Sequence, residues 1–170
     1  MQQMRRELLT WEDVDKLVDR LLSQFNTEYE AMVMVSRGGI IPGGMLSEAM
    51  HILKIFTAAV EFSPVAVEKD ARLLAWPRFI QFPEESLLKG KRILIVDDVW
   101  GSGRTLTSVR NRVAGAGGLP HTCVLHFNPY RNLFEKSRPD YFGAITDAYI
   151  VYPWEIRRGQ EGVILDSCST

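Results

Sequence analysis

The chain has 170 residues, a length that predicts a single domain over residues 1–170 with room for a buried core. Its formal net charge of -1 gives no electrostatic basis for binding nucleic acid, and no apolar run approaches the roughly 20 residues of a membrane span. Cys123 and Cys168 are too few for a disulfide framework and match no metal-site spacing, so we expect a protein of the reducing cytoplasm.

The first expected element is an amphipathic helix that begins at Thr10, with Asp13 placed three residues later as a capping-box partner. Its apolar positions, from Trp11 to Phe25, share one face and predict packing against a sheet. Ala31–Val35 is then an apolar run typical of a strand. A glycine-rich loop and a helix that starts near Pro42 follow it. The loop residues are Ser36, Arg37, Gly38 and Gly39.

A second strand, loop and helix unit lies at residues 92–113. Ile93–Val96 is apolar without alternation, which indicates a strand buried on both faces of a parallel sheet. Asp97 and Asp98 are expected just beyond this strand, and apolar positions at helical spacing begin at Leu106. The intervening loop residues are Gly101, Ser102, Gly103, Arg104 and Thr105. In a doubly wound sheet, ligands bind at this edge.

The chemistry of this second loop favours a phosphate group. Glycines let backbone amides approach an anion, and the start of a helix adds unpaired N–H groups and the positive end of its dipole. The two aspartates would repel a phosphate unless they bind sugar hydroxyls or a magnesium ion. The loop lacks the spacing of ATPase and dinucleotide-binding motifs, which weakens those interpretations.

The segment VDDVWGSGRT, residues 96–105, resembles the phosphoribosyl pyrophosphate signature of type I phosphoribosyltransferases. The resemblance implies that Asp97 and Asp98 contact the ribose hydroxyls and that residues 101–105 hold the 5′-phosphate. Trp100 is bulkier than the aliphatic residue usual in that family. Gly101 stands where many 6-oxopurine members carry an aspartate, so the usual acid or base on the purine side is missing.

The first loop, VSRGG, resembles the pyrophosphate loop of the same family, especially of its xanthine-guanine branch. Ser36, Arg37, Gly38 and Gly39 are therefore the expected pyrophosphate-binding residues. In those relatives the peptide between the residues that match Arg37 and Gly38 is often cis, so that its amide can face pyrophosphate.

Residues 63–90 form a long connection after the strand expected at Ile55–Phe62, and the resemblance implies that it contains a loop that closes over the active site. Lys69 and Arg72 could reach pyrophosphate, although solvated charges are the simpler interpretation. The apolar residues of this segment predict a packed hairpin or a subunit contact. They are Leu73, Leu74, Trp76, Phe79 and Phe82.

The base site is expected in the C-terminal third, after a strand at Thr122–Phe127. Asn128 stands where 6-oxopurine relatives carry a lysine that reads the 6-oxo group, and an amide can donate or accept. The segment from Tyr149 to Glu155 resembles the base-binding hood, which implies stacking by Tyr149, backbone contacts by Ile150 and magnesium binding by Glu155 together with Asp97 and Asp98. Arg131 is interpreted as a solvated loop residue.

Together these features predict a single α/β domain, a mainly parallel twisted sheet with helices on both faces and a small C-terminal hood at approximately residues 128–157. The implied activity is magnesium-dependent transfer of the 5-phosphoribosyl group from phosphoribosyl pyrophosphate to a purine-like nucleobase, as in purine salvage, with release of pyrophosphate. The resemblance also implies a cytoplasmic homodimer or higher homo-oligomer.

Two alternatives stay open. Gly101 and Asn128 depart from the 6-oxopurine pattern, so the base could be an unusual purine or a pyrimidine. The protein could also be a non-catalytic regulator that senses phosphoribosyl pyrophosphate or a nucleotide, although the chain shows no basic face or helix-turn-helix segment.

Overall fold

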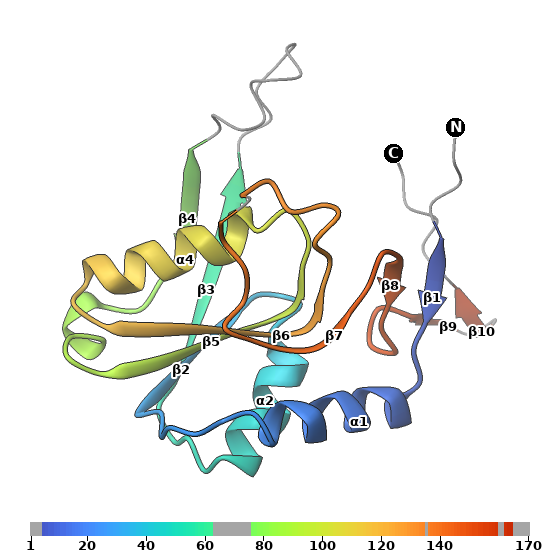
Figure 1. Cartoon of the computed structure of the whole chain (residues 1–170), viewed down its shortest axis with the longest axis horizontal. Helices are drawn as coiled ribbons and strands as arrows, with labels where there is room; N and C mark the ends of the chain where they lie inside the picture. The colour runs from blue at the N-terminus through green and yellow to red at the C-terminus, as the bar shows by residue number, and fades with distance from the viewer. Residues whose placement is uncertain (1–4, 63–75, 135, 160–161, 165–170) are drawn as a thin grey trace.

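The central feature is a six-stranded sheet in the order β4-β3-β2-β5-β6-β7 (Figure 1). The computed structural model describes residues 5–62, 76–134, 136–159 and 162–164. The strands of the sheet are β2 (Ala31–Val35), β3 (Ile55–Phe62), β4 (Pro77–Gln81), β5 (Arg92–Trp100), β6 (Leu119–Phe127) and β7 (Tyr141–Ile145). All neighbours pair in parallel except β3 and β4, which are antiparallel. The predicted fold class, a mainly parallel sheet with helices, is confirmed.

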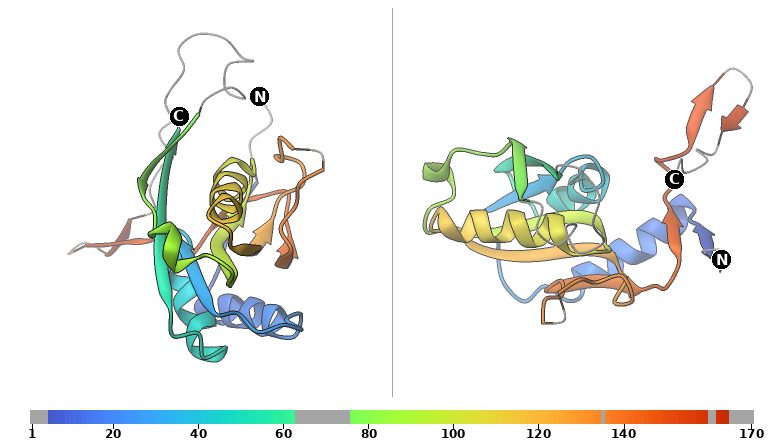
Figure 2. Two further views of the ribbon diagram at one scale, coloured as in Figure 1. Left: turned by 90° about the vertical axis from the view of Figure 1, so that its left-hand side faces the viewer. Right: turned by 90° about the horizontal axis from the view of Figure 1, so that it is seen from above.

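Helices cover both faces of this sheet. The helices are α1 (Trp11–Leu22), α2 (Ile40–Ala49) and α4 (Arg104–Gly115), with a short 3-10 turn at Glu85–Leu87. The views in Figures 1 and 2 place α1 and α2 on one face and α4 on the other. Each face has its own buried apolar cluster, the first around Val14, Leu94 and Leu125 and the second around Ile95, Leu106 and Val109. Burial of the central strands on both sides explains their uninterrupted apolar runs.

Strand β5 is longer than expected. It continues through Asp97 and Asp98 to Trp100, because its parallel ladder with β6 extends to the pair Trp100 and Phe127. The Asn128 amide then donates to the Trp100 carbonyl over 2.9 Å. The two aspartates therefore belong to the last part of a paired strand and not to the loop that follows it.

The ends of the helices follow the sequence signals. Thr10 caps α1 and forms the predicted capping box with Asp13. At the start of α4, Gly103 has a φ of 80°, a left-handed conformation that favours glycine. Trp11 was expected on the buried face of α1, but its side chain is 47% exposed and its ring lies 5.9 Å from that of Trp154.

The β3–β4 hairpin confirms part of the prediction for residues 63–90. Phe79 and Phe82 pack at the edge of the core, and the Arg112 guanidinium lies 4.3 Å and 4.5 Å from their ring centres. Trp76 is 87% exposed and is not packed within the described chain. Lys69, Arg72, Leu73 and Leu74 lie outside the described residues.

A second, smaller unit lies beside the sheet. Strand β1 (Arg6–Leu8) pairs in parallel with β8 (Tyr149–Val151), and β9 (Arg157–Gly159) pairs antiparallel with β10 (Gly162–Ile164). Figure 2 shows these strands projecting away from the main sheet. The pairing of an N-terminal strand with the expected base-binding segment was not predicted. None of the helices within the described chain is both long and apolar enough to cross a membrane.

Candidate active site

The two glycine loops meet at the carboxyl edge of the sheet. Strands β2 and β5 are parallel neighbours, so the loops that follow them leave the sheet side by side. A Cβ atom on Gly38 would lie 2.5 Å from Cγ of Asp98, a separation that real Cβ atoms do not reach. The fold therefore brings the expected pyrophosphate loop against the expected ribose-binding carboxylate, and a side chain at position 38 would require one of them to shift.

The loop at residues 36–39 is fixed by backbone hydrogen bonds at both ends. The Ser36 amide donates to Ala58 O over 2.8 Å, and the Gly39 amide donates to Val35 O over 2.8 Å. The loop contains a cis peptide bond, but it joins Ser36 and Arg37. The expectation of a cis bond between Arg37 and Gly38 is therefore wrong by one residue. Arg37 is exposed at the surface of this loop.

The loop at residues 101–105 leads into the start of α4. The capping residue of this helix, Gly103, has no side chain, so it offers no acceptor to the first helical amides. The Arg104 amide contacts Ser102 Oγ at 3.4 Å. The Arg104 guanidinium lies 4.1 Å from the ring centre of Phe62 on β3, so it faces the neighbouring hairpin. Gly101 and Ser102 lie in the loop itself, and Thr105 lies in the first turn of α4.

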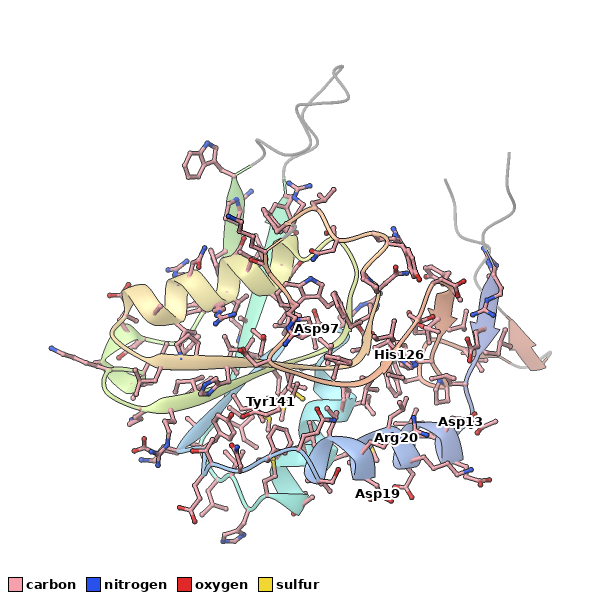
Figure 3. All side chains as sticks on the ribbon, in the orientation of Figure 1. Asp13, Asp19, Arg20, Asp97, His126 and Tyr141 are labelled. Atoms are coloured by element: carbon pink, nitrogen blue, oxygen red, sulfur yellow. The ribbon has the colours of Figure 1, made fainter. Side chains whose placement is uncertain are left out.

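The two aspartates of β5 form a partly buried acidic pair, of which Figure 3 labels Asp97. Burial, and then the charge of Asp98, raise the pKa of Asp97 well above its usual range. Burial, and then the charge of Glu155, raise the pKa of Asp98 to about 6. Both carboxylates are thus destabilised in the ionised form, and a cationic or hydroxyl-donating ligand would relieve this cost.

A cavity of about 90 Å³ lies between the end of β5 and the C-terminal segment. Its lining includes every expected base-binding residue, together with Asp98, Gly101 and Glu155. The lining residues are Asp98, Val99, Gly101, Asn128, Arg131, Ala148, Tyr149, Ile150, Tyr152 and Glu155. Residues from the end of β5, from the turn after β6 and from the C-terminal segment therefore line one cavity beside the acidic pair.

Asn128 is the most distinctive polar residue of this cavity. Its side chain is only 2% exposed, and its Oδ1 atom is buried without a hydrogen-bond partner within the described structure. A buried amide oxygen that lacks a partner costs free energy unless a ligand supplies a donor. Tyr149 also lines the cavity. The Arg6 guanidinium is 5.8 Å from its ring centre, and its backbone amide donates to Arg5 O.

The sequence assigned no site role to four of the lining residues, Val99, Arg131, Ala148 and Tyr152. Tyr152 is almost fully buried, and its hydroxyl donates to the Asp98 carbonyl over 2.9 Å. Arg131 lines the cavity although it was interpreted as a solvated loop residue. Its amide bonds to Asn128 O at 3.3 Å, which closes a turn with proline at the second position. The Asn-Pro pair in the sequence was a usable signal for this turn.

The acidic groups suit magnesium, a cation that prefers carboxylate and phosphate oxygens. Glu155 accepts a hydrogen bond from the Tyr152 amide over 2.8 Å and raises the pKa of Asp98 through its charge. In the part of the chain that the structure describes, however, no three His, Cys, Asp or Glu side chains are grouped to hold a metal ion. Asp97, Asp98 and Glu155 therefore do not form a complete protein cage for a metal.

A larger hollow, of about 290 Å³, lies elsewhere in the described structure. It is lined by Arg5, Glu7, His126, Tyr130, Ala144, Ile145, Thr146 and Asp147. The Arg5 guanidinium is already paired with Asp147 at 2.6 Å. This hollow includes neither glycine loop nor either aspartate of β5, so the smaller cavity is the candidate site.

Comparison with known proteins shows the family to which the chain belongs. The phosphoribosyl transferase domain family matches residues 4–153. A xanthine-guanine phosphoribosyltransferase of Cereibacter sphaeroides is 29% identical over 136 residues, which cover 77% of this chain and 72% of the relative. The crystal structure of a purine phosphoribosyltransferase from Pyrococcus horikoshii superposes with a TM-score of 0.74 and 28% identity, over 89% of this chain and 94% of that chain.

A xanthine-guanine-hypoxanthine phosphoribosyltransferase of Helicobacter pylori has the same fold at 18% identity, with a TM-score of 0.67 over 90% of this chain and 94% of that chain. The family match covers both glycine loops, the acidic pair and most of the cavity. The chain therefore belongs to the phosphoribosyl transferase domain family.

Proposed function

We propose that this phosphoribosyltransferase moves the 5-phosphoribosyl group from phosphoribosyl pyrophosphate to a purine-like nucleobase of the xanthine, guanine or hypoxanthine type. The observation that carries the proposal is the contact between Gly38 and Asp98, because it joins two anion-binding loops at one acidic pair. A substrate with a phosphate at each end and a ribose between them matches that arrangement. The named substrates of the related enzymes support the same assignment.

Each part of the site has a proposed role. Amides and hydroxyls of residues 101–105 hold the 5′-phosphate, and residues 36–39 hold the leaving pyrophosphate. Asp97 and Asp98 accept hydrogen bonds from the ribose hydroxyls and stabilise the positive charge that develops on the sugar. Asn128, Tyr149 and Ile150 bind the base in the cavity between the end of β5 and the C-terminal segment.

Magnesium fits this site as a companion of the substrate. When bound, it would neutralise charge on the departing pyrophosphate. Asp97, Asp98 and Glu155 are the proposed protein ligands, acting directly or through water, and substrate phosphate oxygens complete the coordination. This division agrees with the lack of a three-ligand group in the described residues.

The wider assignments are a cytoplasmic location in purine salvage, a hood at residues 128–157 and a homodimer or higher homo-oligomer. Light scattering after size-exclusion chromatography tests the last of these. A monomer at micromolar concentration would contradict it.

A different base remains the second candidate, because Asn128 can accept from an amine as well as donate to an oxo group. Its unpartnered Oδ1 favours this alternative. Substitution Asn128→Lys restores the donor typical of 6-oxopurine relatives. An unchanged base preference would show that the residue at position 128 does not select the base.

The decisive experiment is pyrophosphate release from phosphoribosyl pyrophosphate and magnesium. The bases to compare are guanine, xanthine, hypoxanthine, adenine, uracil and orotate. Release that depends on a 6-oxopurine supports the proposal, and release only with another base supports the second candidate. Saturable binding of phosphoribosyl pyrophosphate without turnover would indicate a sensor. The double variant Asp97→Asn with Asp98→Asn should abolish transfer and remain folded.

A further inference from the structure

We propose that Trp100 and Asn132 form a clasp that couples the phosphate loop, residues 101–105, to the base-side turn, residues 128–131. The proposal rests on the proposed function, because it takes these segments as the sites of the 5′-phosphate and the base. It assigns both residues a positioning role. A ligand that orders one segment thereby makes binding at the other more favourable.

Trp100 anchors both ends of the base-side segment. It is the last residue of β5, and its side chain is 1% exposed. Its backbone carbonyl accepts from the Asn128 amide over 2.9 Å. Its indole Nε1 donates to Asn132 Oδ1 over 3.2 Å. One buried residue therefore holds both the backbone of Asn128, whose side chain is proposed to read the base, and the residue that follows the turn.

Asn132 in turn hydrogen-bonds to the backbone of residues that follow it in the loop. Its Nδ2 donates to Phe134 O over 3.0 Å and to Ser137 O over 2.6 Å. Its Oδ1 lies 3.4 Å from the Phe134 amide as well. The side chain thus uses both its acceptor and its donors, and it holds the backbone at Phe134 and Ser137.

The clasp also contacts the phosphate loop directly. The Leu133 amide donates to Ser102 O over 3.1 Å. A Cβ on Gly103 would lie 2.6 Å from Trp100 Nε1 and 2.9 Å from Asn132 Oδ1, so the residue that precedes α4 packs on the clasp itself. A shift of the phosphate loop therefore moves the same groups that hold the turn.

Apart from Asn128, which is 2% exposed, the residues of the base-side segment lie at the surface. Tyr130 is 79% exposed, and Arg131 and Leu133 are also exposed. Segments with few buried apolar contacts are those that open most easily, and ligands that order the same segment bind cooperatively. Phosphate binding at Ser102–Thr105 would stabilise the clasp, and the clasp would hold Asn128 and Arg131 at the cavity.

The test measures binding of hypoxanthine by titration calorimetry with and without ribose 5-phosphate. This pair cannot react, because ribose 5-phosphate carries no pyrophosphate leaving group. In the wild-type protein we expect ribose 5-phosphate to tighten hypoxanthine binding by roughly five- to fiftyfold. Trp100→Phe keeps an aromatic ring in the core and removes the N–H donor. This variant should lower the enhancement by roughly three- to tenfold, the effect of one lost hydrogen bond.

A second variant and a control separate coupling from general destabilisation. Asn132→Asp keeps the acceptor for Trp100 but loses both Nδ2 donors, and it should also weaken the enhancement. Tyr29→Phe removes a hydrogen bond of 3.0 Å to Tyr141, outside the clasp, and should lower stability without changing the enhancement.

The outcomes distinguish this proposal from the proposed function. Wild-type protein that binds both ligands independently, or a Trp100→Phe variant with the full wild-type enhancement, overturns the clasp and leaves the transferase assignment intact. Wild-type protein that binds neither ligand and releases no pyrophosphate overturns both.

Discussion

The hydroxyl group of Tyr152 donates a hydrogen bond to the backbone carbonyl of Asp98 over 2.9 Å and so ties the C-terminal segment to the acidic pair. The same hydroxyl lies 2.9 Å from His126 Nδ1. A hydroxyl has one proton, and a carbonyl cannot donate, so His126 must carry its proton on Nδ1 and donate it to Tyr152. Burial lowers the pKa of His126 to about 4, which keeps the imidazole neutral near pH 7.

Removal of this hydroxyl should weaken both the fold and the site. In Tyr152→Phe the His126 Nδ1–H and the Asp98 carbonyl both lose their partner. We expect the free energy of unfolding to fall by about 1 to 3 kcal/mol, because buried polar groups are left unpaired. Urea denaturation measures this loss, and steady-state kinetics should show a higher KM for the base. Wild-type stability in this variant would contradict the assigned hydrogen bonds.

The raised pKa of Asp98 predicts that function is maintained at a cost in stability. A carboxyl group whose folded pKa lies above its unfolded value favours the folded state below the unfolded pKa, about 4, and loses this contribution as the pH rises through about 6. Asp98→Asn keeps a neutral side chain at every pH. We expect it to raise the free energy of unfolding at pH 8 by about 1 to 3 kcal/mol and to abolish transfer.

The pH dependence is the critical part of this measurement. Denaturation at pH 4 should show a much smaller difference between Asp98→Asn and the wild type than at pH 8. Asp19→Asn, on an exposed position of α1, is the matched control and should change stability little at either pH. Equal effects of Asp98→Asn at both pH values would mean that its charge is not the destabilising feature.

The rate of the reaction should report the same ionisation. We expect kcat/KM for phosphoribosyl pyrophosphate to fall as the pH drops through about 6, because protonated Asp98 is a poorer acceptor for ribose hydroxyls and no longer stabilises a cationic sugar. Glu155 raises the pKa of Asp98 by its charge, so Glu155→Gln should move the acidic limb to lower pH. A limb that stays in place would exclude Glu155 as a source of the shift.

Local sequence patterns predicted most of the fold. Uninterrupted apolar runs identified β2 and β5, the mostly apolar segment Ile55–Phe62 identified β3, and Thr10 with Asp13 identified the start of α1. The length of β5 was underestimated, because its last residues pair with β6 and such pairing depends on a strand more than 20 residues away. Pairing of β1 with β8 was missed for the same reason.

The site was only partly predictable. Motifs identified the loops at residues 36–39 and 101–105, since each depends on consecutive residues. The roles of Tyr152, Arg131 and Asn132 depend on contacts between distant segments, and no local pattern distinguishes them from ordinary loop or core residues. Trp100 was noted only as an unusual residue, and its partner Asn132 lies 32 residues further along the chain.

The close approach of Gly38 to Asp98 gives the sharpest steric prediction. A methyl group at position 38 would press against the Asp98 carboxyl, 2.5 Å from Cγ, so either the pyrophosphate loop or the acidic pair must shift. Since catalysis depends on placing the reacting groups to within about 1 Å, we expect Gly38→Ala to lower kcat/KM for phosphoribosyl pyrophosphate by roughly 100-fold or more. Steady-state pyrophosphate release measures this loss.

The matched control is Gly44→Ala in α2, where a Cβ would meet nothing within 4 Å. This substitution should preserve activity and raise stability by about 0.5 to 1 kcal/mol, because alanine favours a helix over glycine. Gly38→Ala with full activity would mean that the loop and the carboxyl move independently. In that case their contact could not be what joins the two halves of the site.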